Sequence, residues 1–216
     1  MTLQNRVDPW GNLTTDPSKE AKLMGNRGRL HNNDRVIMRH YKGKRWLACD
    51  PKFEGIDRKP LFQPSSYSEL FFLDEATALS AGHRPCNDCQ RPRLNEFKAA
   101  WARAFNVAPE KLTVAAIDTQ IHKDRINSTG QKLIFEAALE ELPNGTMVDM
   151  GRVPCLIRDG ELIHWSFNGY VGSSSPSAKA RLQVLTPSCL VQVLKAGFIP
   201  RIHPTVAPLK SLPLNN

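Results

Sequence analysis

Residues 71–89 read FFLDEATALSAGHRPCNDC and join a predicted helix to two closely spaced cysteines. Asp74 can begin the helix, because its carboxylate can accept hydrogen bonds from the N–H groups of the first turn. Gly82 is placed to end the helix as the residue that follows it, and the nearby proline prevents continuation. The chain is therefore turned into Cys86 and Cys89, whose spacing suits half of a zinc site, a redox dithiol or two ordinary buried thiols.

Short strands are predicted upstream of this stretch and a helix downstream of it. Residues 35–49 read RVIMRHYKGKRWLAC, which predicts two strands joined at Lys42-Gly43-Lys44. The side chains expected to face inward from these strands are Val36, Met38, Trp46 and Ala48. Residues 50–68 contain three prolines and are expected to form a long loop. The helix after the cysteines would bury one apolar face formed by Leu94, Phe97, Trp101 and Phe105.

The pattern changes near Pro143. Residues 109–142 read as helical with one break, whereas the residues that follow form short apolar runs separated by glycines. Asp159-Gly160 predicts a hairpin between two of these runs. The second part of the chain is therefore expected to be rich in β-strands.

A final helix is expected near the C-terminus, with Thr186 as its cap, Pro187 in its first turn and Gly197 at its end. Together these patterns predict an α+β protein in three parts. They are a lead-in segment at residues 1–21, a basic α+β domain that carries the cysteine pair at residues 22–142, and a small β-rich domain with a C-terminal helix at residues 143–216.

The composition is that of a globular protein, since 41% of the 216 residues are hydrophobic and 23% are charged. No apolar run is long enough for a transmembrane helix, so no membrane partner is expected. The first residues, MTLQNRVDPWGNL, lack the apolar core of a secretory signal, and we expect a cytoplasmic location. The five scattered cysteines suit a reducing compartment better than a disulfide framework.

The net charge of +8 favours a polyanionic partner such as nucleic acid, because Lys and Arg bind phosphate groups. The excess lies in the first half of the chain, where residues 22–45 hold eight Lys or Arg against one acid. A solvated surface without a partner would explain the same charge equally well. The predicted nucleic-acid contacts are Arg27, Arg29, Arg39, Lys42, Lys44, Arg45, Arg84 and Arg91.

Cys86 and Cys89 can supply two ligands to one Zn²⁺, and Cys49, at the end of a predicted strand, is the natural third. The candidates for the fourth ligand of a structural zinc site are His31, His40, His83, His122 and Asp50. A redox dithiol is disfavoured, because the pair follows a helix and no thioredoxin-like unit surrounds it. Cys155 and Cys189 lie in apolar surroundings and are expected to be buried core thiols.

A zinc-dependent deaminase is excluded by the residues upstream of the pair. These enzymes also carry P-C-x-x-C, but they need a Glu two residues after a zinc-binding His or Cys, because that carboxylate moves the proton. His31, His40 and Cys49 are each followed at that distance by a residue other than Glu. The proton carrier of that chemistry is therefore missing.

Residues 71–89 resemble the end of the zinc-binding domain of Ada, a family of bacterial DNA alkylation-repair proteins. In that family a short Ala-rich helix leads to Gly-[Phe/Tyr]-Arg-Pro-Cys-x-x-Cys, and Cys86 and Cys89 match its two zinc-binding cysteines. Upstream, Cys49 in WLAC matches the first cysteine of a second pair, so that the resemblance covers about residues 35–90. The other cysteine of that pair falls on Phe53, which cannot bind metal.

The resemblance implies a zinc site and favours DNA over RNA as the partner. In the family the first upstream cysteine is also a methyl acceptor, whose zinc-bound thiolate attacks a methyl phosphotriester in DNA. The corresponding residue here is Cys49. Replacement of one thiolate by a neutral ligand would make the site less negative and its thiolates less reactive.

The whole chain also resembles a bacterial family in which four motifs recur together. In this sequence they are Gly25–His31, Trp46–Cys49, Gly82–Cys89 and Ala196–Pro204. The resemblance assigns no function, but it makes His31 the first choice for the fourth zinc ligand and His122 the second.

Three functions follow as alternatives. The first is a zinc-binding protein that binds nucleic acid through its basic half. The second is an enzyme or single-turnover methyl acceptor that uses Cys49, with Asp118, His122 and Arg125 on one helix face lining a site. Those three residues would otherwise belong to the solvated face of an amphipathic helix. The third is a structural zinc module for protein interaction, in which the metal replaces apolar core.

Overall fold

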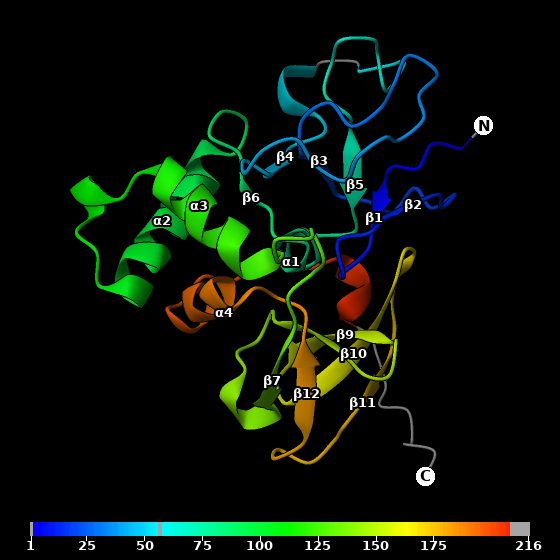
Figure 1. Ribbon diagram of the computed structural model, residues 1–216. Helices are drawn as coiled ribbons and strands as arrows, with labels where there is room; N and C mark the ends of the chain where they lie inside the picture. Colours follow the sequence, from blue (N-terminus) through cyan, green and yellow to red (C-terminus); the bar gives the residue numbers. More distant parts are fainter. Residues whose placement is uncertain (1, 56–57, 208–216) are drawn as a thin grey trace.

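The computed structural model describes residues 2–55 and 58–207 (Figure 1). Within these residues the chain forms two six-stranded sheets and four α-helices, which confirms the predicted α+β class. In Figure 1 the first sheet lies above, the second below, and the short helix α1 lies between them. None of the helices in this part of the chain is both long and apolar enough to cross a bilayer.

The first sheet has the strand order β2-β1-β5-β3-β4-β6. Its strands are β1 (Arg6–Val7), β2 (Leu13–Thr14), β3 (Leu23–Asn26), β4 (Leu47–Cys49), β5 (Leu70–Phe72) and β6 (Arg84–Pro85). Strands β4 and β6 run parallel, with Leu47 opposite Arg84 and Ala48 opposite Pro85. The residues that follow Ala48 and Pro85 in the chain are Cys49 and Cys86, so the pairing register brings the two cysteines together.

The strand predicted at the start of residues 35–49 does not form. Val36 and Met38, which were expected to face inward, are 54% and 63% exposed. The segment is a loop, and its contacts with the chain after β3 include an isolated bridge between His31 and Ile37 and a hydrogen bond of 2.8 Å from Met38 N to Leu30 O. Alternation of apolar residues predicts a strand only where a neighbouring strand is free to pair, and β4 already has β3 and β6 as its neighbours.

The second sheet has the order β11-β10-β9-β8-β12-β7. Its strands are β7 (Phe135–Ala138), β8 (Met147–Asp149), β9 (Pro154–Arg158), β10 (Glu161–Ser166), β11 (Gly169–Ser174) and β12 (Arg181–Val184). The hairpin at Asp159-Gly160 is confirmed, since it joins β9 to β10 with both residues at positive φ. The helix expected to continue to residue 142 is wrong beyond α3, because Phe135–Ala138 pairs with β12 as an edge strand.

Three helices pack together beside the sheets. They are α2 (Arg91–Phe105), α3 (Val114–Arg125) and α4 (Ser188–Lys195). The core among them includes Leu94, Phe97, Trp101, Ile117, Ile121, Leu190 and Val193. Because α4 belongs to the C-terminal part of the chain, it completes a core formed by helices of the N-terminal part.

Helix α4 begins one residue later than predicted. Pro187 is the cap, and the Thr186 hydroxyl instead accepts a hydrogen bond from Met147 N at 2.9 Å.

Helix α1 (Glu75–Ser80) is buried along its whole length. Ala78 packs with the core of the first sheet, whereas Ala76 packs with Met147 and Leu156 of the second. Gly82 follows the helix at φ 84°, where an added Cβ would lie 2.5 Å from Arg125 Cδ. This conformation and this close approach leave room only for glycine.

The Asp74 carboxylate caps α1 and also binds the C-terminal half of the chain. Its Oδ1 accepts from Thr77 N at 2.9 Å and from Thr77 Oγ1 at 2.7 Å. Its Oδ2 accepts from Tyr170 Oη at 2.8 Å and from His203 N at 3.1 Å. Burial and the Asp74 charge raise the pKa of Tyr170 well above its ordinary value, so the phenol remains a donor.

Glu75 makes a second connection. Its carboxylate pairs with Arg93 of α2, with Arg93 Nη2 2.7 Å from Oε2, and it accepts from Arg201 N at 2.8 Å. Trp165 of β10 donates to Thr77 Oγ1 at 3.0 Å. Adjacent acids at the start of one short helix thus bind the second sheet, the segment after α4 and the three-helix layer.

We predict that Asp74→Ala lowers the free energy of unfolding by about 3 kcal/mol, because it removes a helix cap and leaves buried donors without an acceptor. Urea denaturation followed by circular dichroism measures the change. Asp34→Ala is the control, since Asp34 is exposed and a surface substitution should change stability by less than about 0.5 kcal/mol. Equal losses in both variants would contradict the role given to Asp74.

Candidate metal centre

Three cysteines meet where β4, β6 and the start of α2 come together. Cys49 ends β4, Cys86 directly follows β6, and Cys89 lies in the turn before α2. Their Sγ atoms all lie within 4.8 Å of one another. Cys49 and Cys86 are 8% and 5% exposed, and Cys89 is more accessible. The three thiols form a group that could hold a metal ion.

Electrostatics within this group favours a thiolate. A hydrogen bond from the Cys49 thiol lowers the pKa of Cys86 to about 5, and backbone N–H groups at Asp88 and Cys89 act in the same direction. The pKa of Cys49 is raised, because its thiol is the donor to Cys86 and is buried. Burial also raises the pKa of Cys89. A soft divalent cation could replace the shared protons, since thiolates are its preferred ligands.

The surroundings also suit thiolate ligands. The backbone N–H of Asp50 donates to Cys89 Sγ at 3.3 Å, and Cys86 N donates to Ala48 O at 2.9 Å, which fixes the turn. Met24 and Leu47 pack against the cysteines. N–H···S contacts and an apolar environment orient the ligands of a metal and limit the access of water.

His31, the first choice for a fourth ligand, does not join the three cysteines. Its Nδ1 lies 2.6 Å from Ser68 Oγ, its Nε2 lies 3.1 Å from Gln63 O, and its ring stacks on Phe62. Both ring nitrogens are therefore engaged in holding the loop that precedes β5. This placement corrects the sequence-based assignment of His31 to the metal site.

Three of the other candidates are also engaged elsewhere. His122 Nδ1 lies 2.8 Å from Arg125 Nη2, and His83 lies between Arg27 and the carbonyl of Leu47. Asp50 Oδ1 accepts from Lys52 N. Among the described residues, the cluster contains the three cysteines without a histidine or a carboxylate.

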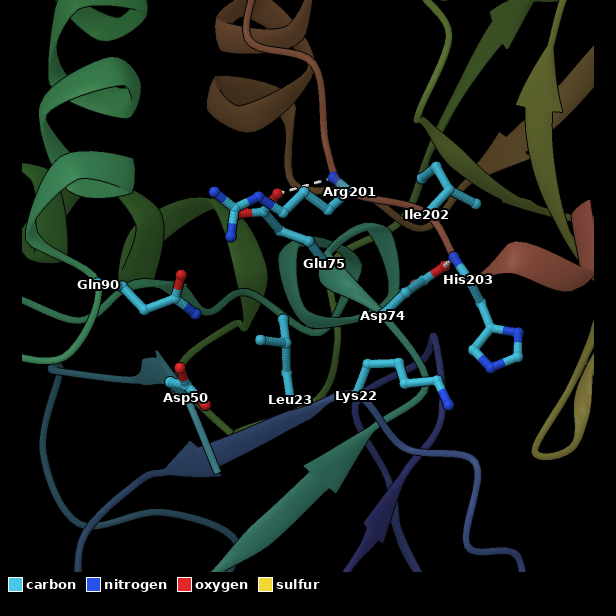
Figure 2. A pocket seen from close by; sticks show the side chains of 9 residues that line it. All are labelled: Lys22, Leu23, Asp50, Asp74, Glu75, Gln90, Arg201, Ile202 and His203. Carbon is cyan, nitrogen blue, oxygen red and sulfur yellow. Dashed lines mark hydrogen bonds between the residues drawn. The ribbon is translucent and has the colours of Figure 1, made fainter. Parts of the chain in front are cut away.

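A cavity of about 310 Å³ is lined by residues that follow two of the cysteines in the chain (Figure 2). Asp50 and Gln90, which directly follow Cys49 and Cys89 in the chain, line one side of it. Ile202 and His203 lie on the opposite side. The carboxylates of Asp74 and Glu75 also face the cavity, but the hydrogen bonds described above already use them.

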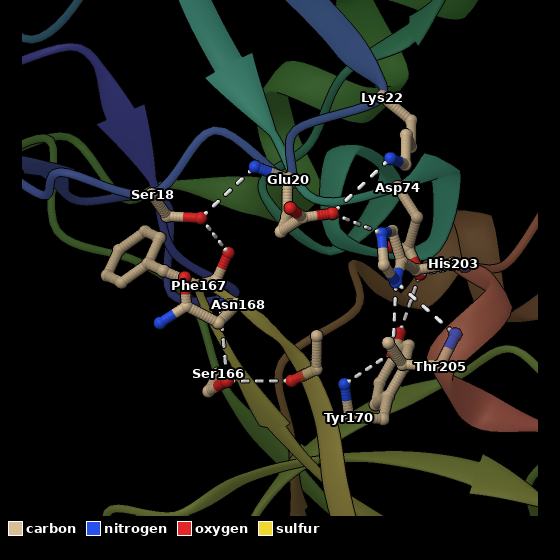
Figure 3. A network of polar contacts seen from close by, with 11 residues as sticks. Ser18, Glu20, Lys22, Asp74, Ser166, Phe167, Asn168, Tyr170, His203 and Thr205 are labelled. Carbon is tan, nitrogen blue, oxygen red and sulfur yellow. Dashed lines mark hydrogen bonds and ion pairs between the residues drawn. The ribbon is translucent and has the colours of Figure 1, made fainter. Parts of the chain in front are cut away.

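His203 is the one side chain of this cavity with a buried ring nitrogen that lacks a hydrogen-bond partner among residues 2–55 and 58–207. Its Nδ1 lies 2.9 Å from Thr205 Oγ1, and its Nε2 lies 3.6 Å from Glu20 Oε2. Burial lowers the pKa of His203. Figure 3 shows the ring within a polar network that joins the N-terminal segment at Ser18–Lys22 to β10 and β11. This network stabilises the junction between the two sheets.

The predicted nucleic-acid contacts divide into two groups. Arg27 and Arg84 are each 1% exposed, and Arg84 pairs with Asp118 through two contacts of 2.8 Å. These two arginines are internal and cannot contact a partner at the surface, which corrects the sequence-based set. The remaining members are partly or fully exposed: Arg29, Arg39, Lys42, Lys44, Arg45 and Arg91.

The three residues proposed to line a catalytic site, Asp118, His122 and Arg125, lie on α3 as predicted. Their side chains bind other residues of the protein. Asp118 is the partner of Arg84, and Arg125 lies over the Trp46 ring with its guanidinium carbon 3.6 Å from the centroid. Arg125 also donates to Gly82 O at 2.9 Å. The sequence pattern does not reveal these partners, because they are far away in the chain.

Comparisons with family models, curated proteins and solved structures find no match to this chain. The class of protein is therefore defined by fold and site: an α+β protein with a three-cysteine group that could hold a metal ion.

We predict that the purified protein binds about one zinc ion per chain and that Cys86→Ala abolishes this binding, because the remaining thiols cannot complete the site. Metal content by mass spectrometry and a thiol-competing zinc indicator measure the change. Cys155→Ala is the matched control, since Cys155 is equally buried but lies in the second sheet. Retention of zinc by Cys86→Ala would contradict the assignment.

Proposed function

We propose that this chain is a zinc-binding protein with an Ada-like site that binds nucleic acid, DNA in particular, through the basic loop formed by residues 35–45. The observation that carries the proposal is the convergence of Cys49, Cys86 and Cys89 within 4.8 Å. The metal would be Zn²⁺, because thiolates are among its preferred ligands, and the three cysteines would supply three of the four ligands of a tetrahedral site.

The zinc would hold structure in this proposal. It would join the end of β4 to the turn between β6 and α2, where β6 is only two residues long. A strand pair this short contributes few hydrogen bonds, so a metal that binds both sides would supply much of the local stability.

The basic loop supports the nucleic-acid part of the proposal. It presents five exposed cations and follows Asp34, the nearest acid. The cations are Arg35, Arg39, Lys42, Lys44 and Arg45. Its backbone is held from both sides, because Lys42 N donates to Arg27 O at 2.8 Å and Arg125 Nη2 donates to Lys44 O at 2.9 Å. A fixed backbone that carries exposed cations suits phosphate binding, since little ordering is needed on association.

Methyl transfer to Cys49 receives less support. Cys49 is 8% exposed, so its sulfur offers little surface to a methyl phosphotriester. Cys89 is the most accessible of the three sulfurs. We therefore assign the cysteines to metal binding.

We predict that single-stranded DNA binds with an affinity that falls steeply with salt. The double substitution Lys42→Gln/Lys44→Gln should reduce the slope of log K against log[salt] by about 1.4, because two phosphate contacts are lost. Fluorescence anisotropy over a salt series measures the slope. Lys111→Gln/Lys123→Gln removes the same charge from exposed positions elsewhere and should leave most of the slope intact. An affinity that is independent of salt, or equal effects of the two double variants, would contradict the proposal.

A further inference from the structure

A second cavity of about 320 Å³ lies away from the cysteines, between the N-terminal loop, the segment before β4 and the end of α3. Three cationic side chains line it: Arg27, Arg125 and Lys132. Each comes from a different part of the chain, and none belongs to the metal centre or to the exposed cations of the basic loop.

Arg27 is held rigidly at the wall of this cavity. It is 1% exposed, its Nε donates to His83 Nε2 at 2.8 Å, and its Nη1 donates to Gly11 O at 2.9 Å. Its Nη2 is buried and has no hydrogen-bond acceptor among the described residues. A buried donor without an acceptor costs stability, and more so when the group is charged.

Arg125 repeats this arrangement and also contacts the Trp46 ring. It is 2% exposed and uses Nη1 and Nη2 for the carbonyls of Gly82 and Lys44, while its Nε has no acceptor within the described part of the chain. The guanidinium carbons of Arg27 and Arg125 lie 4.0 and 3.6 Å from the Trp46 ring centroid. The indole thus fixes both guanidinium groups by cation–π contact.

Positive charge exceeds negative charge around this cavity. Burial lowers the pKa values of Arg27 and Arg125 to about 9 and that of Lys132 to about 7, and repulsion by the neighbouring arginines adds to the effect at Arg125 and Lys132. The acids that act on them are Asp8, for Arg27 and Lys132, and Asp118, for Arg125. Asp118 is already paired with Arg84, and Asp8 is left to balance Arg27 and the protonated form of Lys132.

We propose that this cavity binds the phosphate group of a small ligand or of a nucleic-acid end, with Arg27, Arg125 and Lys132 as its anchors. A phosphate offers several acceptor oxygens to the free N–H groups of the two arginines and to the ammonium of Lys132, which also donates to Ser80 O. The remainder of the ligand would contact Trp10, Tyr41 and Gln131, which line the same cavity. The volume is at the lower end for small-molecule sites, which limits the buried part to a phosphate and a few further atoms.

Isothermal titration calorimetry on the full chain tests this site with three probes: inorganic phosphate, a nucleoside monophosphate, and a short DNA strand with or without a 5′-phosphate. Saturable binding of phosphate is expected, with the affinity at least tenfold lower in Lys132→Met. If only the monophosphate binds more tightly than inorganic phosphate, the ligand is a free nucleotide. If only the 5′-phosphorylated strand binds more tightly than the strand without the phosphate, the ligand is a DNA end. Absence of binding for all probes would overturn the proposal.

Lys123→Met is the matched control, because Lys123 is an exposed lysine on α3 outside the cavity. It should bind phosphate as the unchanged protein does, and equal loss in both variants would overturn the proposal. Arg27→Met would test the same site, but its side chain is internal, so circular dichroism must first show that the variant folds. The double variant Lys42→Gln/Lys44→Gln should retain phosphate binding, which separates this site from the basic loop of the proposed function.

Discussion

The buried Asp74 carboxylate is the constraint on which much of this structure depends. A charge removed from water is tolerated only when hydrogen bonds replace its hydration, and Asp74 receives them from Thr77, Tyr170 and His203. These donors belong to α1, to β11 and to the segment after α4. Satisfying one carboxylate therefore brings three distant parts of the chain together, and Glu75 does the same for α2 and Arg201.

The metal centre depends on strand pairing in the same way. Cys86 and Cys89 are close because only two residues separate them, whereas Cys49 reaches them because β4 and β6 run parallel with Ala48 opposite Pro85. A shift of one residue in this register would turn the Cys49 side chain to the other face of the sheet. The Sγ atoms of the three cysteines lie within 4.8 Å of one another, so the group could hold a metal ion.

The basic residues of the N-terminal half occupy two kinds of position in the structure, exposed and internal. Some cations lie on an exposed loop with an anchored backbone, while Arg27, Arg84 and Arg125 are internal and are held by Asp118, by backbone carbonyls and by the face of Trp46. Charge counting along a sequence treats these residues alike. Burial separates them, because an internal guanidinium must find acceptors and a surface guanidinium already has water.

Local signals in the sequence were sufficient for the elements that depend on neighbouring residues. Four features could be predicted, since each requires contacts within a few positions. They are the cap at Asp74, the glycine after α1, the turn at Asp159-Gly160 and the proximity of Cys86 to Cys89. Only the tertiary structure decided that residues 135–138 form a strand, that His31 binds Ser68, and that Arg27 and Arg84 are internal. These outcomes depend on partners far away in the chain, and the free energy of long-range pairing and burial exceeds the local preference at those positions.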